Sequence, residues 1–437
     1  MDQHTATIYS GLMDHLKSKI ADPEFMKRHR SHEKAFTRRR CLTFVTIVVF
    51  LLNMLKHALQ DELDEYFKRL TDSEFSDRQV TKSAFSQARQ KLKHSAFIEL
   101  NRDQVSYFYD HFEWQSWHGK RLVAMDGSLT DLPNTPVLQE HFGFWQPAAG
   151  GRCAKARVSQ MFDVLNKVSL DALIMPKENG ERVLAAHHCQ HLTKDDLVLL
   201  DRGYPAFWLF SLIRQQQAHF CARMSVSEWE VVKEFVASGQ AEQIVALQPC
   251  YNAQQACQQR NLPPTPLPVR LVRLDGPEPD EPLVLASSLL DQLLFPFEYF
   301  AELYPHRWPV ETDYGYIKLL LEVENWSGTS VEAIYQDFHA TVFSKNLAAI
   351  VSQPAQQHVT AQSQSRKYPY QVNMANLFSK MKDTLVSLFF CPNPVPFFQF
   401  LWRQMTQTIE PIRPGRSFPR KKRVKPKRFS MNRKSLR

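Results

Sequence analysis

The hydrophobic and polar positions of the chain change pattern several times along its length. Residues 1–115 show helical periodicity with many charged positions, and they enclose one apolar run, Leu42 to Leu55. Residues 118–224 contain short apolar runs that alternate with helical patterns. Strand-like runs separated by prolines follow up to residue 297, and helical patterns return after it. The pattern predicts an α/β protein in which helical regions precede and follow a sheet-containing core.

Within residues 118–224 the pattern predicts three strands, a helix, a strand, a helix and a strand. These elements are a strand at 121–126, a hairpin of 158–165 and 168–175, a helix at 181–189, a strand ending at 200, a helix at 205–216 and a strand at 219–224. Two further apolar runs, 269–274 and 283–286, predict a strand-rich insertion. A stretch rich in glutamine and serine at 353–366 predicts a linker or loose loop, and the apolar pattern of 374–390 predicts a last helix.

Two aspartates each end an apolar run. Asp126 stands in Met-Asp-Gly-Ser after residues 122–125, and Asp201 stands in Leu-Leu-Asp-Arg-Gly-Tyr after residues 197–200. Each is predicted to lie at the mouth of a buried strand, where a carboxylate can reach solvent or a metal. Carboxylates gathered there would repel one another. Two divalent cations held by Asp and Glu oxygens would remove that conflict and form a clamp for displacement at phosphorus.

A third carboxylate belongs to a set of polar residues at offsets of three, seven and fourteen from the first of them. The set is Tyr304, Arg307, Glu311 and Lys318. On a helix these offsets fall on one face, which would place an acid for a metal beside cations for phosphate oxygens. Pro305 and Pro309 predict that the helix begins near Pro309, so that the first two members lie on the approach to it.

The Tyr-x2-Arg-x3-Glu-x6-Lys spacing that starts at Tyr304 resembles the signature of the insertion-sequence family-four group of DDE transposases. The contexts of Asp126 and Asp201 resemble the first and second aspartate motifs of that family. The similarity extends to Ser83-Ala-Phe-Ser-Gln-Ala-Arg89, to Ala156-Arg-Val-Ser-Gln160 and to the basic C-terminus, so it covers most of the chain.

The resemblance implies an RNase H-like catalytic core in which the first and fourth strands lie side by side and bring Asp126 next to Asp201. Glu311 would come from a later helix, and the three carboxylates would bind two Mg2+ ions, for which Mn2+ can substitute. The implied activity is DNA cleavage at the ends of an insertion element, followed by strand transfer into target DNA. The implied partners are the element ends, the target DNA and a second copy of the chain.

Other residues receive roles from the same resemblance. Contacts to phosphate or DNA are expected from Tyr304, Arg307, Lys318 and Arg202, and base stacking is expected from Trp229. Two of these assignments have plain alternatives, because Arg202 could pair with an acid and Trp229 could pack in a small hydrophobic core. The whole chain also has two alternatives: a DNA-binding protein that has lost catalysis, and a metal-dependent nuclease that cuts without joining.

The expected organisation has six segments. They are a helical N-terminal DNA-binding domain (1–115), the first part of the RNase H-like core (118–224), the β-rich insertion (225–297), the rest of the core (298–352), a linker with a C-terminal helical region (353–410) and a basic tail (411–437). In the first segment, a predicted helix from Ser83 to Leu100 could offer side chains to base edges, namely those of Ser83, Ser86, Gln87, Arg89 and Gln90. The alternative is a helical bundle that packs on the core.

Charge changes this picture only at the C-terminus. Residues 411–437 contain twelve Lys or Arg and no acid, so the remainder of this +9 chain carries a net charge of −3. The tail is expected to contact DNA without reading sequence, or else to act as a solubilising end.

Composition excludes several other classes of protein. Seven scattered cysteines without a Cys-x2-Cys pair argue against structural disulfides and zinc. The histidines near His188 are expected to be ordinary core or surface residues. The apolar run at 42–55 is too short to span a bilayer, and no secretory signal precedes it, so the expected location is the bacterial cytoplasm, at the nucleoid.

Overall fold

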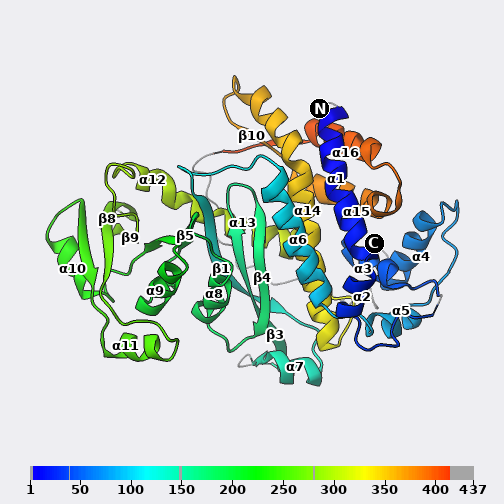
Figure 1. Cartoon of the computed structure of the whole chain (residues 1–437), viewed down its shortest axis with the longest axis horizontal. Helices are drawn as coiled ribbons and strands as arrows, with labels where there is room; N and C mark the ends of the chain where they lie inside the picture. Colours follow the sequence, from blue (N-terminus) through cyan, green and yellow to red (C-terminus); the bar gives the residue numbers. More distant parts are fainter. Residues whose placement is uncertain (1–2, 39, 147–149, 279–280, 414–437) are drawn as a thin grey trace. The chain divides into compact units, whose positions relative to one another are not determined.

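The computed structural model describes residues 3–38, 40–146, 150–278 and 281–413, which form two compact units (Figure 1). The first unit comprises Met1–Glu113, Thr130–Lys155 and Gly315–Arg437, and the second comprises Trp114–Leu129 and Ala156–Tyr314. Most of the predicted basic tail, from residue 414 on, lies outside the described residues. None of the helices that the structure describes combines the length and the apolar character needed to cross a membrane.

A mixed sheet forms the second unit, with its strands in the order β4-β3-β1-β5-β6-β9-β8-β7. The strand bounds are β1 Arg121–Asp131, β3 Cys153–Asp163, β4 Val168–Pro176, β5 Asp196–Leu200, β6 His219–Arg223, β7 Glu242–Leu247, β8 Leu267–Glu278 and β9 Glu281–Ser287. β5 runs parallel to both β1 and β6, whereas β3 and β4 form an antiparallel hairpin. The predicted strands and helices of the core occur in the predicted order, but a helix and a short strand within 136–145 that were not predicted lie between β1 and β3.

The central parallel strands are buried and carry nearly continuous apolar runs, although β5 begins with the buried Asp196. Residues 122–125 of β1 are fully buried, and so are all five residues of β5. Strands with this environment have nearly continuous apolar runs instead of alternating ones. These apolar runs therefore predict the strands from the sequence, and burial of their side chains places the strands at the centre of the unit.

Helices and short helical turns complete the second unit. Their bounds are α8 Glu181–Cys189, α9 Phe207–Gln215, α10 Glu230–Ala237, α11 Tyr251–Gln258, α12 Tyr299–Leu303, η1 Tyr304–Arg307 and α13 Pro309–Gly315. The predicted insertion thus contains two helices, α10 and α11, in addition to its strands, and Figure 1 shows α10 beside the β8–β9 hairpin. β9 pairs with β6, so the insertion extends the core sheet.

The first unit is mainly helical. Its elements are α1 Gln3–Ala21, α2 Pro23–His29, α3 Phe44–Leu52, α4 Leu59–Leu70, α5 Lys82–Arg89, α6 Ser95–His111, α7 Pro136–Phe142, β2 Phe144–Trp145, the π-helical turn η2 Tyr316–Leu320, α14 Val331–Ser363, β10 Tyr370–Val372, α15 Met374–Phe390, α16 Val395–Gln407 and β11 Ile409–Pro411. α3 is the apolar run of the sequence, and it is a buried helix as predicted.

The predicted linker at 353–366 is wrong, because α14 continues through it to Ser363. Ala355 and Val359 are buried on this part of the helix, so packing overrides the polar composition. The side-chain amide of Gln356 also holds a neighbouring strand: it donates to the Tyr370 carbonyl at 3.1 Å and accepts from the Val372 amide at 2.9 Å. A glutamine-rich stretch can therefore be helical when its amides bind a neighbouring strand.

The single helix expected from Ser83 to Leu100 is two helices, α5 and α6. The chain between them pairs with the end of α2, where the Lys93 amide donates to the His29 carbonyl at 2.8 Å. On α5, the Arg89 side chain is buried, so its predicted exposure to DNA bases is wrong. Its guanidinium donates to three side chains of the C-terminal part of the chain, Gln336 at 2.8 Å, Ser327 at 2.6 Å and Asp337 at 2.8 Å, and to the Ala333 carbonyl at 3.3 Å.

Arg89→Ala is expected to lower the free energy of unfolding by about 3–5 kcal/mol, because it leaves the carboxylate of Asp337, whose side chain is only 11% exposed, without its cation. Urea denaturation followed by tryptophan fluorescence measures this loss. Gln87→Ala, at an exposed position of the same helix, is the control and should change the free energy little. Equal losses in the two variants would contradict the structural role of Arg89.

Candidate active site

The register of β1 against β5 sets the two aspartates level with each other. The paired residues run from Arg121 opposite Asp196 to Ala124 opposite Leu199. Continuing this offset of 75 residues by two positions places Asp126 opposite Asp201. Asp201 therefore lies directly after β5, at its carboxyl end, and Asp126 lies level with it on β1, which does not end at residue 126 as predicted but continues to Asp131. The carboxyl ends of parallel strands are where α/β sheets place ligand-binding residues.

Asp201 stands on a tight turn directly after β5. Its Oδ1 accepts a hydrogen bond from the Gly203 amide at 2.7 Å. A β-carbon at position 203 would lie 3.2 Å from that oxygen, closer than most side chains tolerate. The glycine of the Asp-Arg-Gly-Tyr motif therefore allows the backbone to approach the carboxylate.

Glu311 lies in the first turn of α13, as the prolines of this segment predicted. Arg307, on the preceding turn η1, is buried and donates to Glu311 Oε1 at 2.7 Å. Tyr304 begins the same turn, and its buried hydroxyl donates to the Leu200 carbonyl at 3.4 Å. This bond connects the turn that carries Arg307 to the end of β5, one residue before Asp201.

The electrostatics of Asp126 report the proximity of all these groups. Burial, together with the negative charges of Asp201 and Glu311, raises the pKa of Asp126 to about 7, while the Gly127 amide and Arg307 act in the opposite direction. Arg307 in turn has a raised pKa: burial lowers it, and the hydrogen bond to Glu311 and the surrounding negative charges together outweigh that effect. The three predicted carboxylates are therefore electrostatically coupled, with one buried cation among them.

Sequence reasoning missed a further acid near Asp126. A β-carbon at Gly127 would lie 2.8 Å from the Glu181 side chain, so the glycine leaves room for the first turn of α8. Glu181 is paired there with Arg157 at 2.7 Å. Only the Asp-Gly dipeptide hinted at this close approach. The buried Tyr204 also senses the charges of Asp126, Glu181 and Asp201, which raise its pKa further after burial has done so.

The donor set suits a hard divalent cation. Asp126, Asp201 and Glu311 offer carboxylate oxygens, the ligands that Mg2+ prefers. The negative charges of Asp201 and Glu311 add to burial in raising the pKa of Asp126, and a cation would offset those charges. Within the described residues, no three His, Cys, Asp or Glu side chains already stand in a metal-binding arrangement.

The remaining predicted residues lie in different surroundings. Arg202 is exposed next to Asp201. Trp229 is half-buried at the start of α10, with its ring stacked on Phe210 at 6.5 Å between centroids. Lys318 lies in η2, which belongs to the first unit. The structure thus brings the three carboxylates, Arg307 and Tyr304 together within the second unit.

Two other features are not part of this group. His188 is buried and bound to Asp171 at 2.8 Å, which confirms that it is a core histidine.

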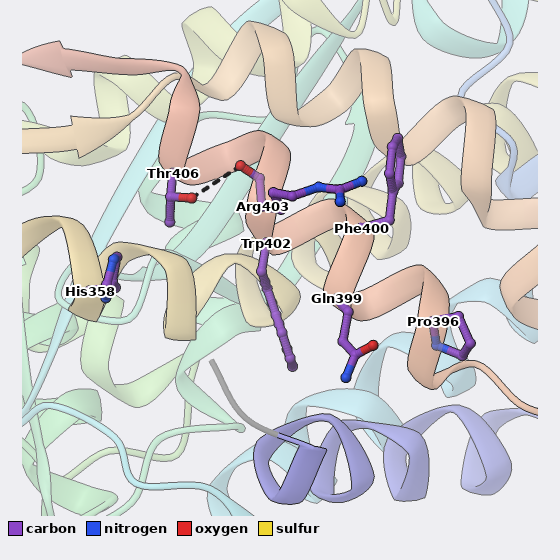
Figure 2. Close-up of a pocket in the computed structure, with 7 residues that line it drawn as sticks. All are labelled: His358, Pro396, Gln399, Phe400, Trp402, Arg403 and Thr406. Atoms are coloured by element: carbon purple, nitrogen blue, oxygen red, sulfur yellow. Dashed lines mark hydrogen bonds between the residues drawn. The ribbon is translucent and has the colours of Figure 1, made fainter.

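A surface hollow in the first unit is formed by His358 of α14 and by residues of α16 from Pro396 to Thr406 (Figure 2). None of the residues that line it is acidic, and Trp402 there is held by a bond from its indole nitrogen to the Val351 carbonyl at 2.7 Å. The hollow is therefore not the carboxylate site.

Asp126 on β1, Asp201 after β5 and the turn of Tyr304, Arg307 and Glu311 form one group rich in carboxylates. Comparison with known proteins gives the family of the chain. The family model described as "Transposase DDE domain" matches residues 117–347, more than half of the chain. The chain belongs to this family, and the predicted membership among DDE transposases is confirmed.

One relative comes from the group that the sequence resembles. The chain is similar to transposase InsG for insertion sequence element IS4 of Escherichia coli (strain K12), with 22% identity over 418 residues that cover 93% of this chain and 91% of that protein. Among solved structures, the piggyBac transposase synaptic complex with hairpin DNA matches with a TM-score of 0.46 and 11% identity, covering 93% of this chain and 87% of that one.

Stability at different pH values tests the charge excess around Asp126. Its ordinary pKa is 3.8 and its pKa in the fold is about 7, so between these values the folded chain binds the proton more tightly than the unfolded chain. In chelator-treated protein, this contribution to stability is complete at low pH and is lost as the pH rises through about 7. The pKa shift sets an upper bound of about 4 kcal/mol on the gain in the free energy of unfolding when this charge is removed at pH 8. Asp126→Asn should therefore raise the melting temperature at pH 8 by a few degrees and change it little at pH 4.

Differential scanning calorimetry of both proteins across this pH range makes the comparison. A wild-type melting temperature that equals or exceeds that of Asp126→Asn at pH 8 would contradict the charge excess.

Proposed function

We propose that the chain is a transposase that cleaves DNA at the ends of an insertion element and joins those ends to target DNA. One observation carries this proposal: the register of β1 and β5 sets Asp126 level with Asp201, and both Asp201 and Glu311 raise the pKa of Asp126. Membership in the DDE transposase family supports it. The strand order β4-β3-β1-β5-β6, with β5 parallel to its two neighbours, supports an RNase H-like core.

Asp126, Asp201 and Glu311 would hold two Mg2+ ions, and Mn2+ could replace them. When bound at such a site, these ions favour deprotonation of an attacking water or 3′-hydroxyl and offset the charge that develops on the scissile phosphate. Asp126 would act as a ligand in its ionised form, which a nearby cation favours.

Arg307 would orient Glu311 through the hydrogen bond of 2.7 Å and place a positive charge beside the carboxylates. Its planar guanidinium suits phosphate oxygens as well. Tyr304, Arg202 and Lys318 are assigned to phosphate or DNA contact. For Tyr304 the bond to the Leu200 carbonyl supports a second role, holding the turn of Arg307 against the end of β5.

Trp229 is proposed to stack on a displaced base. Its half-buried position leaves part of the ring available, while its stacking on Phe210 supports the alternative of a packing role.

In the first unit, the face of α5 that carries Ser83, Ser86, Gln87 and Gln90 is exposed and is proposed to contact the element end. Joining two ends requires two active sites, so the working complex is proposed to contain at least a dimer.

Cleavage of a duplex that carries the DNA flanking this gene tests the proposal. In Mg2+, the wild-type chain should cut the duplex at the element end and join it to a target plasmid, whereas Asp201→Ala should lower the rate of both steps at least a hundredfold, as expected for loss of a metal ligand. The matched control is Asp195→Ala, which removes an exposed aspartate just before the same strand and should retain activity.

The outcomes separate the alternatives. Cutting without joining would identify a nuclease. Binding of the DNA without cutting, by the wild type and both variants, would leave only a DNA-binding protein.

A further inference from the structure

The main-chain carbonyl of Asp126 accepts hydrogen bonds from two side chains on different elements. The hydroxyl of Tyr314, on α13, donates to it at 2.8 Å, and the hydroxyl of Ser159, on β3, donates to it at 3.2 Å. A carbonyl oxygen has two lone pairs, so both are used at the residue that carries the first carboxylate of the site. All of these residues belong to the second unit.

The bond from Tyr314 connects two of the three carboxylates. Tyr314 lies three residues after Glu311 on α13, so its hydroxyl ties the helix that carries Glu311 to the backbone of Asp126. Burial raises the pKa of Tyr314 well above its usual range, so the hydroxyl keeps its hydrogen and remains a donor. The distance between Asp126 and α13 is therefore set by a direct bond as well as by packing.

The bond from Ser159 continues into the core. Ser159 Oγ lies 2.9 Å from His188 Nε2, and His188 Nδ1 lies 2.8 Å from Asp171 Oδ2. Ser159 and Asp171 share one face of the β3–β4 hairpin, because Asp171 pairs with Met161, two residues from Ser159. His188 reaches both from α8, and all three side chains are buried. This arrangement is a continuous hydrogen-bonded chain of three residues.

The direction of these bonds follows from the available hydrogens. Ser159 has one hydroxyl hydrogen and donates it to Asp126, so it accepts from His188 Nε2. The other ring nitrogen of His188, Nδ1, lies 2.8 Å from Asp171 Oδ2, so Asp171 holds the imidazole in place. The Ser159–His188–Asp171 arrangement resembles a nucleophilic serine with its base. However, Ser159 is buried, and its hydroxyl hydrogen is directed at a backbone oxygen. Its role is therefore to hold the backbone.

We propose that Tyr314 and the Ser159–His188–Asp171 chain are positioning residues that keep Asp126 and Glu311 at the separation that a shared divalent cation requires. This inference rests on the proposed function, because it assumes that the two carboxylates bind a metal. Mg2+ and Mn2+ tolerate little variation in the placement of their oxygen ligands. Groups that orient metal ligands typically change metal affinity about 10- to 100-fold when they are removed.

Titration calorimetry with Mn2+ on the full-length chain without DNA tests the inference. The test variants are Tyr314→Phe and Ser159→Ala, each of which removes one hydroxyl, and Asp126→Asn removes a proposed ligand. The control is Tyr66→Phe: Tyr66 is also buried and donates to a backbone carbonyl, that of Thr46 at 3.1 Å, but it belongs to the first unit. Each variant is first checked for cooperative thermal unfolding, and Ser159→Ala carries the test alone if Tyr314→Phe does not fold.

Support requires that Asp126→Asn abolish Mn2+ binding, that Tyr314→Phe and Ser159→Ala weaken it about tenfold or more, and that Tyr66→Phe leave it unchanged. Wild-type affinity in both test variants, with binding still dependent on Asp126, would overturn the inference and leave the proposed function intact. Mn2+ binding that does not depend on Asp126 would overturn both.

The Mg2+ dependence of DNA cleavage gives a second measurement. For Tyr314→Phe and Ser159→Ala, the Mg2+ concentration at half-maximal rate should rise about tenfold or more, while the rate at saturating Mg2+ returns close to the wild-type value. A purely structural loss would lower the saturating rate and leave the Mg2+ midpoint unchanged, and that result would overturn the inference.

Discussion

The parallel pairing of β1 with β5 is the constraint on which the site depends. This register brings Asp126 level with Asp201 and concentrates negative charge just beyond the last paired residues of these two central strands. The cost appears in the raised pKa of Asp126, which burial and the neighbouring acids produce together. A stable fold gains nothing from this arrangement, since like charges in a poorly solvated place repel one another. A divalent cation would resolve this conflict, so the strand register and the proposed chemistry are two aspects of one feature.

The segment that supplies Glu311 is organised around a buried cation. Arg307 binds Glu311 directly and is close enough to Asp201 for their charges to interact. Tyr304 anchors the same turn to the end of β5. The Tyr-x2-Arg-x3-Glu spacing therefore describes a turn followed by the start of a helix. Its first two members are buried and attach the acid to the strand that precedes Asp201.

Buried polar side chains in the first unit join segments that are distant in sequence. Arg89 binds Ser327, Gln336 and Asp337, so helix α5 is fastened to the segment that leads into α14. A polar residue in a segment proposed to contact DNA thus has an internal structural role. Buried charges of this kind are costly unless they are fully paired, which makes such contacts specific to one arrangement of the helices.

Local sequence patterns predicted the elements and the carboxylates, because both depend on short-range signals. Apolar runs marked β1 and β5, the prolines before Glu311 marked the start of α13, and the family resemblance rested on fixed offsets along the chain. The same local reasoning was wrong at residues 353–366, where buried side chains and the amide bonds of Gln356 continue a helix. It also missed the attachment of the insertion to β6.

What the sequence by itself determined is the set of acids, their order and the strands and turns that present them. Only the tertiary structure decided that Tyr314 and Ser159 meet at the carbonyl of Asp126 and that Arg89 is buried. The physical reason is that each of these contacts joins residues from separate elements. Their partners depend on how strands and helices pack, and no spacing along the chain encodes that packing.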